Sequence, residues 1–254
     1  MIYFVPEAVQ EYAALGLEGR MGYFASRAAP MGAVPADVVI ATFFNFEPGL
    51  VRRSIPEAWE IAPPNAIVAA RFRAADTALR RILGDAIDSD DMRVASELAR
   101  RATNGCYPEG RPLYAGHASL EWPDEPHLVL WHAQTLLREF RGDGHIAAMV
   151  SQGINGPEAL VHHDATGDLP PGVLQRSRAW RDDGWIAAVN RLRARGWLDE
   201  KGAFTDEGYT ARQWVEDTTD ALMLPCWEQL GEEDCQRLRA LVRPWSTDLA
   251  KLIA

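Results

Sequence analysis

Lysine is nearly absent from this chain of 254 residues, in which Lys201 and Lys251 are the only lysines among 26 basic residues. Acidic residues number 36, so the formal net charge is −10. Affinity for nucleic acid comes largely from neutralising phosphates, and this balance therefore argues against a general nucleic-acid binder. It leaves open a local surface that is rich in arginine.

Cysteines and long apolar runs are also scarce. The three cysteines, Cys106, Cys226 and Cys235, are odd in number and lack CxxC spacing, which predicts free thiols in a reducing compartment. No apolar run reaches the roughly 18 residues that a membrane span needs, and no signal-peptide pattern is visible. The sequence therefore predicts a cytoplasmic protein without a membrane partner.

Familiar catalytic motifs are missing as well. The chain has no GxGxxG, no P-loop and no GxSxG elbow. All six histidines lie in one stretch, but no pair has the spacing of a zinc-binding helix, and no metal site is predicted. These histidines are His117, His127, His132, His145, His162 and His163.

Helical patterns fill most of the chain and are interrupted at short intervals by Gly and Pro, which predicts a mainly α fold. Ser89 is expected to cap one helix. The segment Gly142-Asp143-Gly144 predicts a turn that ends a Leu-rich helix at Phe140 and places His145 at the head of the next. The expected helices cover 6–15, 21–29, 35–44, 47–55, 56–61, 65–83, 90–102, 127–140 and 185–195.

An internal repeat is suggested by Ala58-Trp59, which recurs as Ala179-Trp180, a displacement of 121 residues. The same displacement places Val39-Ile40 on Leu160-Val161, and Phe24 on His145. We interpret this as a tandem duplication, with residues 1–126 as an N-terminal winged-helix-like half and residues 127–254 as a C-terminal winged-helix half with a helical tail.

The second half carries the winged-helix pattern most clearly. A helix ends at Gly196, Trp197-Leu198 and Ala203-Phe204 predict two very short strands around a turn, and Thr205 is expected to cap the following helix. This wing resembles that of MarR-type regulators. The phrases Tyr23–Gly32, Leu137–His145 and Thr219–Leu222 resemble a largely uncharacterised bacterial helix-turn-helix family. Together the resemblances imply tandem winged-helix halves that form a pseudo-dimer, as a monomer or a homodimer.

Aromatic and arginine residues in the matched phrases predict a small-molecule pocket at the seam between the two halves. Such a pocket suits a planar or carboxylated ligand. The alternative is an ordinary aromatic core in which the arginines pair with Glu139 or Asp143. The expected ligand-binding residues are Tyr23, Phe24, Arg27, Phe43, Phe44, Phe46, Trp131, Arg138, Arg141 and His145.

His145 is the strongest single candidate for chemistry. Beside Asp143 it suits a general base, an anion contact or an axial ligand to haem. The alternative is that Asp143 caps a helix and His145 simply packs at the seam.

Contact with duplex DNA is expected from arginines on two candidate recognition helices, 47–55 and 171–180. Arginine suits phosphate and guanine contacts, although the predicted wing around Asp199-Glu200 is acidic. The expected DNA-binding residues are Arg52, Arg53, Arg176, Arg178 and Arg181.

Three functions are compatible with these patterns, and the third of them is an interaction module that binds no ligand. The first is a DNA-binding regulator that responds to a small molecule. The second is an enzyme or cofactor-binding protein, with haem as the candidate cofactor, on a winged-helix scaffold that no longer binds DNA.

Overall fold

The structure is a computed structural model that describes residues 2–250, and it is mainly helical, as the sequence predicts. Two compact units make up the chain, and each is assembled from segments that are distant in sequence. Within the described residues, no helix is long and apolar enough to cross a membrane. Unit 1 comprises Met1–Val34, Ser54–Arg141 and Met223–Ala254, and unit 2 comprises Pro35–Arg53 and Gly142–Leu222.

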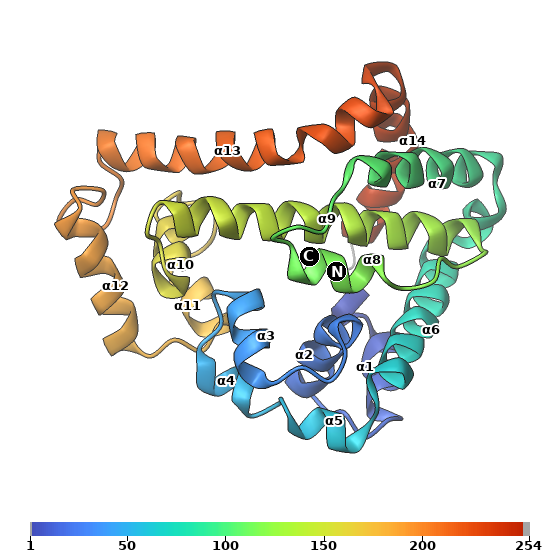
Figure 1. The fold of residues 1–254 in the computed structure, drawn as a ribbon, viewed down its shortest axis with the longest axis horizontal. Coiled ribbons are helices and arrows are strands. Elements are labelled where there is room, and N and C mark those ends of the chain that lie inside the picture. Colours follow the sequence, from blue (N-terminus) through green and yellow to red (C-terminus); the bar gives the residue numbers. More distant parts are fainter. Residues whose placement is uncertain (1, 251–254) are drawn as a thin grey trace. The chain divides into compact units, whose positions relative to one another are not determined.

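Unit 1 is organised around α6 (Pro64–Leu83), which packs against α1 (Pro6–Ala13) and α2 (Arg20–Ala28) (Figure 1). Helix α14 (Glu232–Ala250) packs on α7 (Asp90–Ala102) and on α6. Ser89 caps α7 by accepting a hydrogen bond from the Met92 amide, which confirms the predicted cap. The unit also contains η1 (Ile2–Phe4), η2 (Ala29–Met31), α5 (Glu57–Ile61), η3 (Gly84–Asp88), η4 (Thr103–Gly105) and α8 (Pro112–Ala118).

Unit 2 joins an early segment of the chain to a late one. Its early helices are α3 (Ala36–Phe43) and α4 (Pro48–Arg52). Its late helices are α10 (Gly156–Asp164), α11 (Val173–Ser177) and α12 (Asp182–Ala194), and α10 packs against α12. Two long helices, α9 (Pro126–Ser151) and α13 (Asp206–Leu230), contribute residues to both units.

The predicted turn at Gly142-Asp143-Gly144 is wrong, because α9 continues through it to Ser151 (Figure 1). A glycine inside a helix costs about 1 kcal/mol, which burial of neighbouring side chains can outweigh. Phe140 is fully buried on one side of this stretch and Ala148 is almost fully buried on the other. The glycine that follows the end of α9 is Gly153, whose φ of +68° favours a residue without a side chain.

The predicted wing is reduced to a single antiparallel bridge between Leu198 and Phe204. The turn is closed by the Asp199 carboxylate, which accepts hydrogen bonds from the amides of Lys201 and Ala203. A carboxylate that satisfies these amides removes the need for a longer ladder of strand pairs. Thr205 accepts a hydrogen bond from the Gly208 amide, so the predicted cap of α13 is confirmed.

The division into sequence halves 1–126 and 127–254 stays a prediction. The two compact units are defined by packing, and packing does not test whether the halves arose by duplication. Each unit has its own apolar core. Met92, Leu136, Phe140 and Leu230 belong to the core of unit 1. The core of unit 2 includes Ala148, Leu192, Trp197, Leu198 and Phe204.

Four of the clustered histidines, His117, His127, His132 and His162, are buried. His162 in unit 2 is the clearest example of a core histidine. Its ring is fully buried against the rings of Trp197 and Phe204, with centroids 5.9 and 5.0 Å away. Neither ring nitrogen has a hydrogen-bond partner within residues 2–250. Burial, with a smaller contribution from Arg212, lowers the pKa of His162 to about 4.

His162 therefore predicts acid sensitivity of unit 2. His162 is protonated near pH 6.5 in the unfolded chain, whereas in the folded chain it is protonated only near pH 4. Stability is then lost as the pH falls through this window, by an amount on the order of 3 kcal/mol. We expect His162→Leu to flatten the dependence of unfolding free energy on pH. His163→Gln, at the adjacent half-buried position, is the control, and an equal pH slope in His162→Leu and the wild type would contradict the assignment.

Candidate functional site

A cavity of about 280 Å³ lies within unit 1, where α6, α9 and α14 approach one another. Two arginines line it, and none of its lining residues is Asp or Glu. Most of the other lining side chains are aromatic or aliphatic, with a few polar ones among them. An apolar cavity with a small number of polar groups is the usual form of a small-molecule site.

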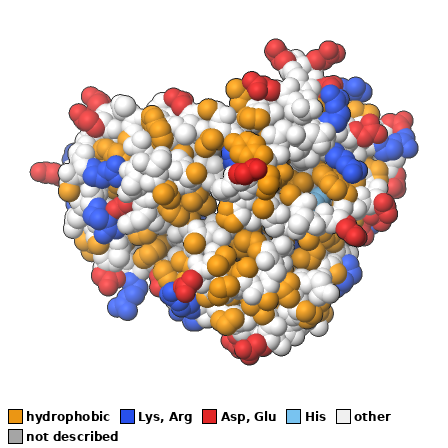
Figure 2. All heavy atoms as spheres, viewed as in Figure 1, with side chains coloured by type: hydrophobic (Ala, Val, Ile, Leu, Met, Phe, Trp, Pro, Cys, Tyr) orange, Lys and Arg blue, Asp and Glu red, His pale blue; other side chains and the backbone are white. Residues whose placement is uncertain are grey.

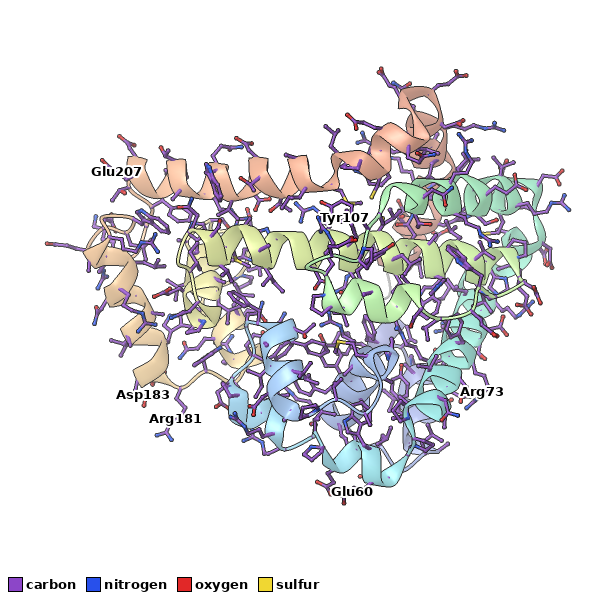
Figure 3. All side chains as sticks on the ribbon, viewed as in Figure 1. Glu60, Arg73, Tyr107, Arg181, Asp183 and Glu207 are labelled. Carbon is purple, nitrogen blue, oxygen red and sulfur yellow. The ribbon has the colours of Figure 1, made fainter. Side chains whose placement is uncertain are left out.

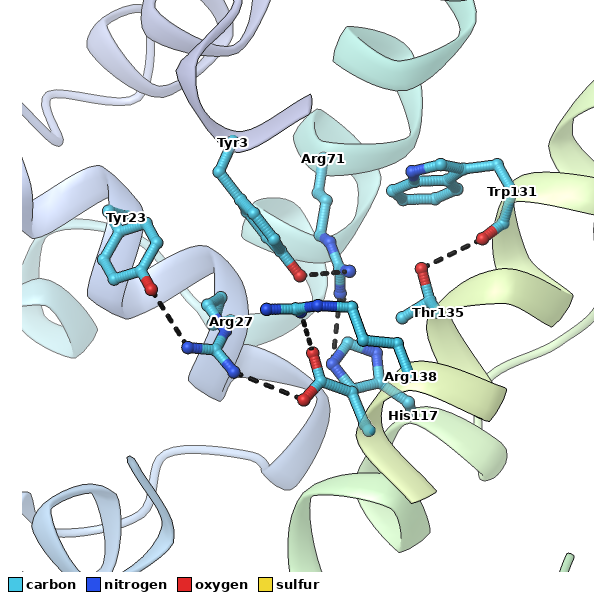
Figure 4. A network of polar contacts seen from close by, with 9 residues as sticks. Tyr3, Tyr23, Arg27, Arg71, His117, Trp131, Thr135 and Arg138 are labelled. Atoms are coloured by element: carbon cyan, nitrogen blue, oxygen red, sulfur yellow. Dashed lines mark hydrogen bonds and ion pairs between the residues drawn. The ribbon is translucent and has the colours of Figure 1, made fainter. Parts of the chain in front are cut away.

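Arg71 is the most unusual residue of this cavity. Its side chain comes from the middle of α6 and is only 2% exposed. The guanidinium donates to His117 Nδ1 at 3.0 Å and to the Tyr3 hydroxyl at 3.0 Å, and it lies 5.0 Å from the centre of the Trp131 ring (Figure 4). Arg71 forms no ion pair with any carboxylate in the described part of the chain.

His117 meets Arg71 as a neutral ring. Burial, followed by the charge of Arg71, holds the pKa of His117 well below its usual range. A guanidinium can only donate hydrogen bonds, so the ring nitrogen that faces it must be an unprotonated acceptor. His117 therefore satisfies one donor of Arg71 without neutralising its charge.

A second polar group surrounds Glu139, which is 3% exposed on α9. Its carboxylate accepts from Arg27 at 3.2 Å and from Arg138 at 2.6 Å, and Arg27 also donates to the Tyr23 hydroxyl at 3.0 Å (Figure 4). Both arginines therefore contact Glu139, the arrangement that the aromatic-core alternative expected. One carboxylate serves two guanidinium groups here, and Arg71 adds a third cation.

The structure brings together part of the predicted pocket. Trp131 and Arg138 line the cavity. Tyr23 and Arg27 belong to the Glu139 group, and Phe24 is fully buried with its ring 5.4 Å from that of Tyr23. Arg141 is exposed on α9. The other predicted pocket residues, Phe43, Phe44, Phe46 and His145, belong to unit 2. The ring centroids of Phe43 and Phe46 are 6.3 Å apart.

The candidate catalytic residues Asp143 and His145 both lie on α9. They are two residues apart, and side chains at that spacing leave a helix in different directions. The His145 Nδ1 instead lies 2.9 Å from the hydroxyl of Thr219, which donates to the Val215 carbonyl at 2.6 Å. The Thr219 oxygen therefore accepts the Nδ1 proton, which fixes the tautomer of His145. His145 does not line the cavity of unit 1.

The predicted DNA-binding arginines all belong to unit 2, although two of them lie more than a hundred residues before the others. The Glu47 amide donates to the Arg178 carbonyl at 3.0 Å, and the Trp180 indole donates to the Asn45 carbonyl at 2.8 Å. The Arg178 guanidinium lies 4.7 Å from the Phe46 ring centre. These contacts join the segment around α4 to the segment after α11.

Four of these arginines, Arg52, Arg53, Arg176 and Arg181, are exposed, and Arg178 is half-buried. Arg52 pairs with Asp37 at 2.6 Å. Arg181 and Asp183 both extend away from the ribbon beside the start of α12, 3.9 Å apart (Figure 3). Basic and acidic side chains alternate over the face drawn in Figure 2. The arginine surface of unit 2 is therefore of mixed charge.

Sequence reasoning missed Arg71, Tyr3 and the role of His117. A signal for Arg71 exists, since it lies on the buried face of α6 that Ile67 and Ala74 define at helical spacing. An arginine within an apolar stripe predicts a buried charge. His117 and Tyr3 gave no comparable signal. The described residues contain no group of three or more His, Cys, Asp or Glu that is placed to hold a metal ion.

The chain matches the model of a helix-turn-helix family over residues 1–252. The match covers nearly all of the chain, so the protein belongs to this helix-turn-helix family. No curated protein and no solved structure matches the chain. The family description gives the structural motif and no ligand or reaction.

The contacts of Glu139 with Arg27 and Arg138 predict that removal of the Glu139 charge lowers the free energy of unfolding. Glu139→Gln removes the negative charge that both Arg27 and Arg138 contact, and loss of one partner of a buried ion pair costs about 3–5 kcal/mol. We expect that decrease in the free energy of unfolding, measured in urea by circular dichroism. Glu11→Gln removes an exposed pair with Arg73 and should cost about 1 kcal/mol or less. Equal losses in the two variants would contradict this account.

Proposed function

We propose that this member of a helix-turn-helix family is a DNA-binding regulator that responds to a small molecule. The observation that carries the proposal is the gathering of all five predicted DNA-binding arginines in unit 2. The same unit contains α10, α11 and α12, followed by the Leu198–Phe204 bridge and the start of α13. We take this order as that of a MarR-like winged helix, in which α12, the helix before the bridge, would read DNA.

This order moves the proposed recognition helix from residues 171–180 to α12, which directly precedes the bridge. Glu158 on α10 is 4% exposed and bonds to Arg191 on α12, which holds the two helices together. The Glu158 carboxylate also completes a capping box with Asn155 at the start of α10. The proposed DNA-reading helix is therefore held to α10 by a charge pair in which Glu158 is buried and Arg191 is partly exposed.

The acidic residues of unit 2 do not prevent DNA binding. Asp37 and its partner Arg52 are both well exposed, and Arg181 and Asp183 more so. Exposed pairs of this kind contribute about 0–1 kcal/mol, so arginines can exchange them for phosphate contacts at small cost. Affinity is then expected to be modest and to fall steeply with salt.

The duplication belongs to the same proposal. At a displacement of 121 residues α3 falls on α10, and α7 falls within α13, which supports two related halves. Two winged-helix-like halves in one chain would act as a pseudo-dimer, and the ligand site predicted at their seam stays a prediction.

An enzyme or cofactor-binding protein is the second candidate. Asp182 and Asp183 open α12, where they would repel phosphates, and this observation favours a scaffold that no longer binds DNA. The bond from His145 to buried Thr219 orients the imidazole, as partners of haem-ligating histidines do. An absorption spectrum with mass analysis of the purified protein tests this candidate. Absence of a chromophore or retained ligand, with behaviour unchanged in His145→Ala, would count against it.

DNA binding predicts a specific salt dependence. We expect the wild type to bind duplex DNA from the region upstream of its own gene at low salt. In the double variant Arg52→Gln, Arg53→Gln, the slope of log affinity against log salt should fall by about one per arginine. Fluorescence anisotropy measures both quantities.

The control for this experiment is Arg93→Gln, which changes an exposed, paired arginine of α7 in unit 1. This control should bind DNA like the wild type. No binding at low salt, or an unchanged slope in the double variant, would overturn the DNA-binding proposal.

A further inference from the structure

The cavity of unit 1 has a cationic end and an apolar end. Arg71 and Arg138 line it together with Tyr3, whose hydroxyl and ring both contact Arg71. Leu79 and Leu83 line it from the same helix as Arg71, about 12 and 18 Å farther along the axis of α6. The cavity is therefore polarised along its length.

Helix α14 supplies much of the apolar lining. Val242, Trp245 and Leu249 line the cavity at positions i, i+3 and i+7, so they share one face of the helix. All three are half-buried. Ser246 lines the cavity from the next position along that face. An apolar chain or ring in the cavity would complete the burial of these side chains.

In the part of the chain that the structure describes, Arg71 has no carboxylate partner. The Glu139 carboxylate contacts Arg27 and Arg138 but not Arg71. Among the described residues the Arg71 Nε also has no hydrogen-bond partner, although the side chain is almost completely buried. A buried cation is ordinarily paired, because removal of a charge from water is costly. An anionic ligand would supply both the missing charge and the missing acceptor.

A carboxylate fits this end better than a phosphate does. A carboxylate binds a guanidinium through two parallel N–H···O bonds, and it carries a single charge. A phosphate monoester carries a charge of about −1.5 to −2 and has three acceptor oxygens, and the Glu139 carboxylate next to Arg138 would repel the additional charge. The Arg71 Nε, which has no partner among the described residues, can supply one of these two bonds.

We propose that unit 1 binds an elongated organic acid, with its carboxylate at Arg71 and Arg138 and its apolar body against α14. The volume of about 280 Å³ lies just below the roughly 300–1,000 Å³ of small-molecule pockets, which favours a ligand the size of a medium-chain acid. The inference names the ligand class for the proposed regulator. It rests on the ligand-responsive part of that proposal and does not require DNA binding.

The direct test is calorimetry of the full chain, without DNA, against decanoate, decanol and decylamine. The three probes share one apolar chain and differ only in the head group. We expect decanoate to bind at least roughly tenfold more tightly than decanol, because a desolvated charge pair contributes more than the factor of ten that 1.4 kcal/mol gives. Decylamine should not bind.

Equal affinity for decanoate and decanol, tighter binding of decylamine, or no binding of any probe would overturn the proposal. Loss of DNA binding in the preceding experiment would leave these results unaffected. The two proposals therefore fail separately.

Two variants locate the site within unit 1. Arg71→Met should abolish the preference for decanoate over decanol while retaining the apolar chain contacts. Val242→Trp should fill the cavity from α14 and weaken the binding of decanoate and decanol alike. This variant tests the site even if Arg71→Met does not fold. Arg93→Gln is the matched arginine control and should bind decanoate like the wild type. An unchanged decanoate preference in a folded Arg71→Met protein would contradict the role of Arg71.

Discussion

The buried guanidinium of Arg71 is the constraint on which unit 1 depends. It lies in the middle of α6, contacts His117 and Tyr3, and has no carboxylate partner among the described residues. In that part of the chain, neutral acceptors and aromatic rings surround this desolvated positive charge. Burial of a cation among neutral groups is costly. Under the proposed ligand binding, an anion in the adjoining cavity would offset that cost, and the same residue would connect the stability of the fold to the ligand.

Neutral histidines are a consequence of this electrostatic design and of burial. His117 is held neutral beside Arg71, and burial with the charge of Arg71 lowers the pKa of His132 to about 4. His162 is neutral in the core of unit 2. The clustering of histidines in the sequence thus reflects core packing in these three cases. His145 differs, because its bond to Thr219 orients the ring within the helical part of unit 2.

Local structure was largely predictable, since caps and breaks depend on neighbouring residues. Ser89 and Thr205 cap the helices that the sequence assigned to them. The turn at Gly142 was mispredicted, because packing of Phe140 and Ala148 outweighs the low helix propensity of glycine. Arg138 and Trp131 were predicted as pocket residues and do line a cavity. Contacts such as that of Arg71 with His117, 46 residues away, depend on the tertiary fold and could not be read from spacing.

The proposed partner of Arg71 is the ionised carboxylate of a ligand. The most direct test therefore measures the protonation state of the carboxyl group of a bound ligand. Decanoate labelled with ¹³C at its carboxyl carbon reports its protonation state through the chemical shift when bound. A guanidinium in a low-dielectric site lowers the pKa of a contacting carboxyl group. At a pH near the pKa of the free acid, the bound ligand should therefore show the shift of the carboxylate. A shift typical of the protonated acid would mean that the cavity is only an apolar site, and it would contradict the central claim.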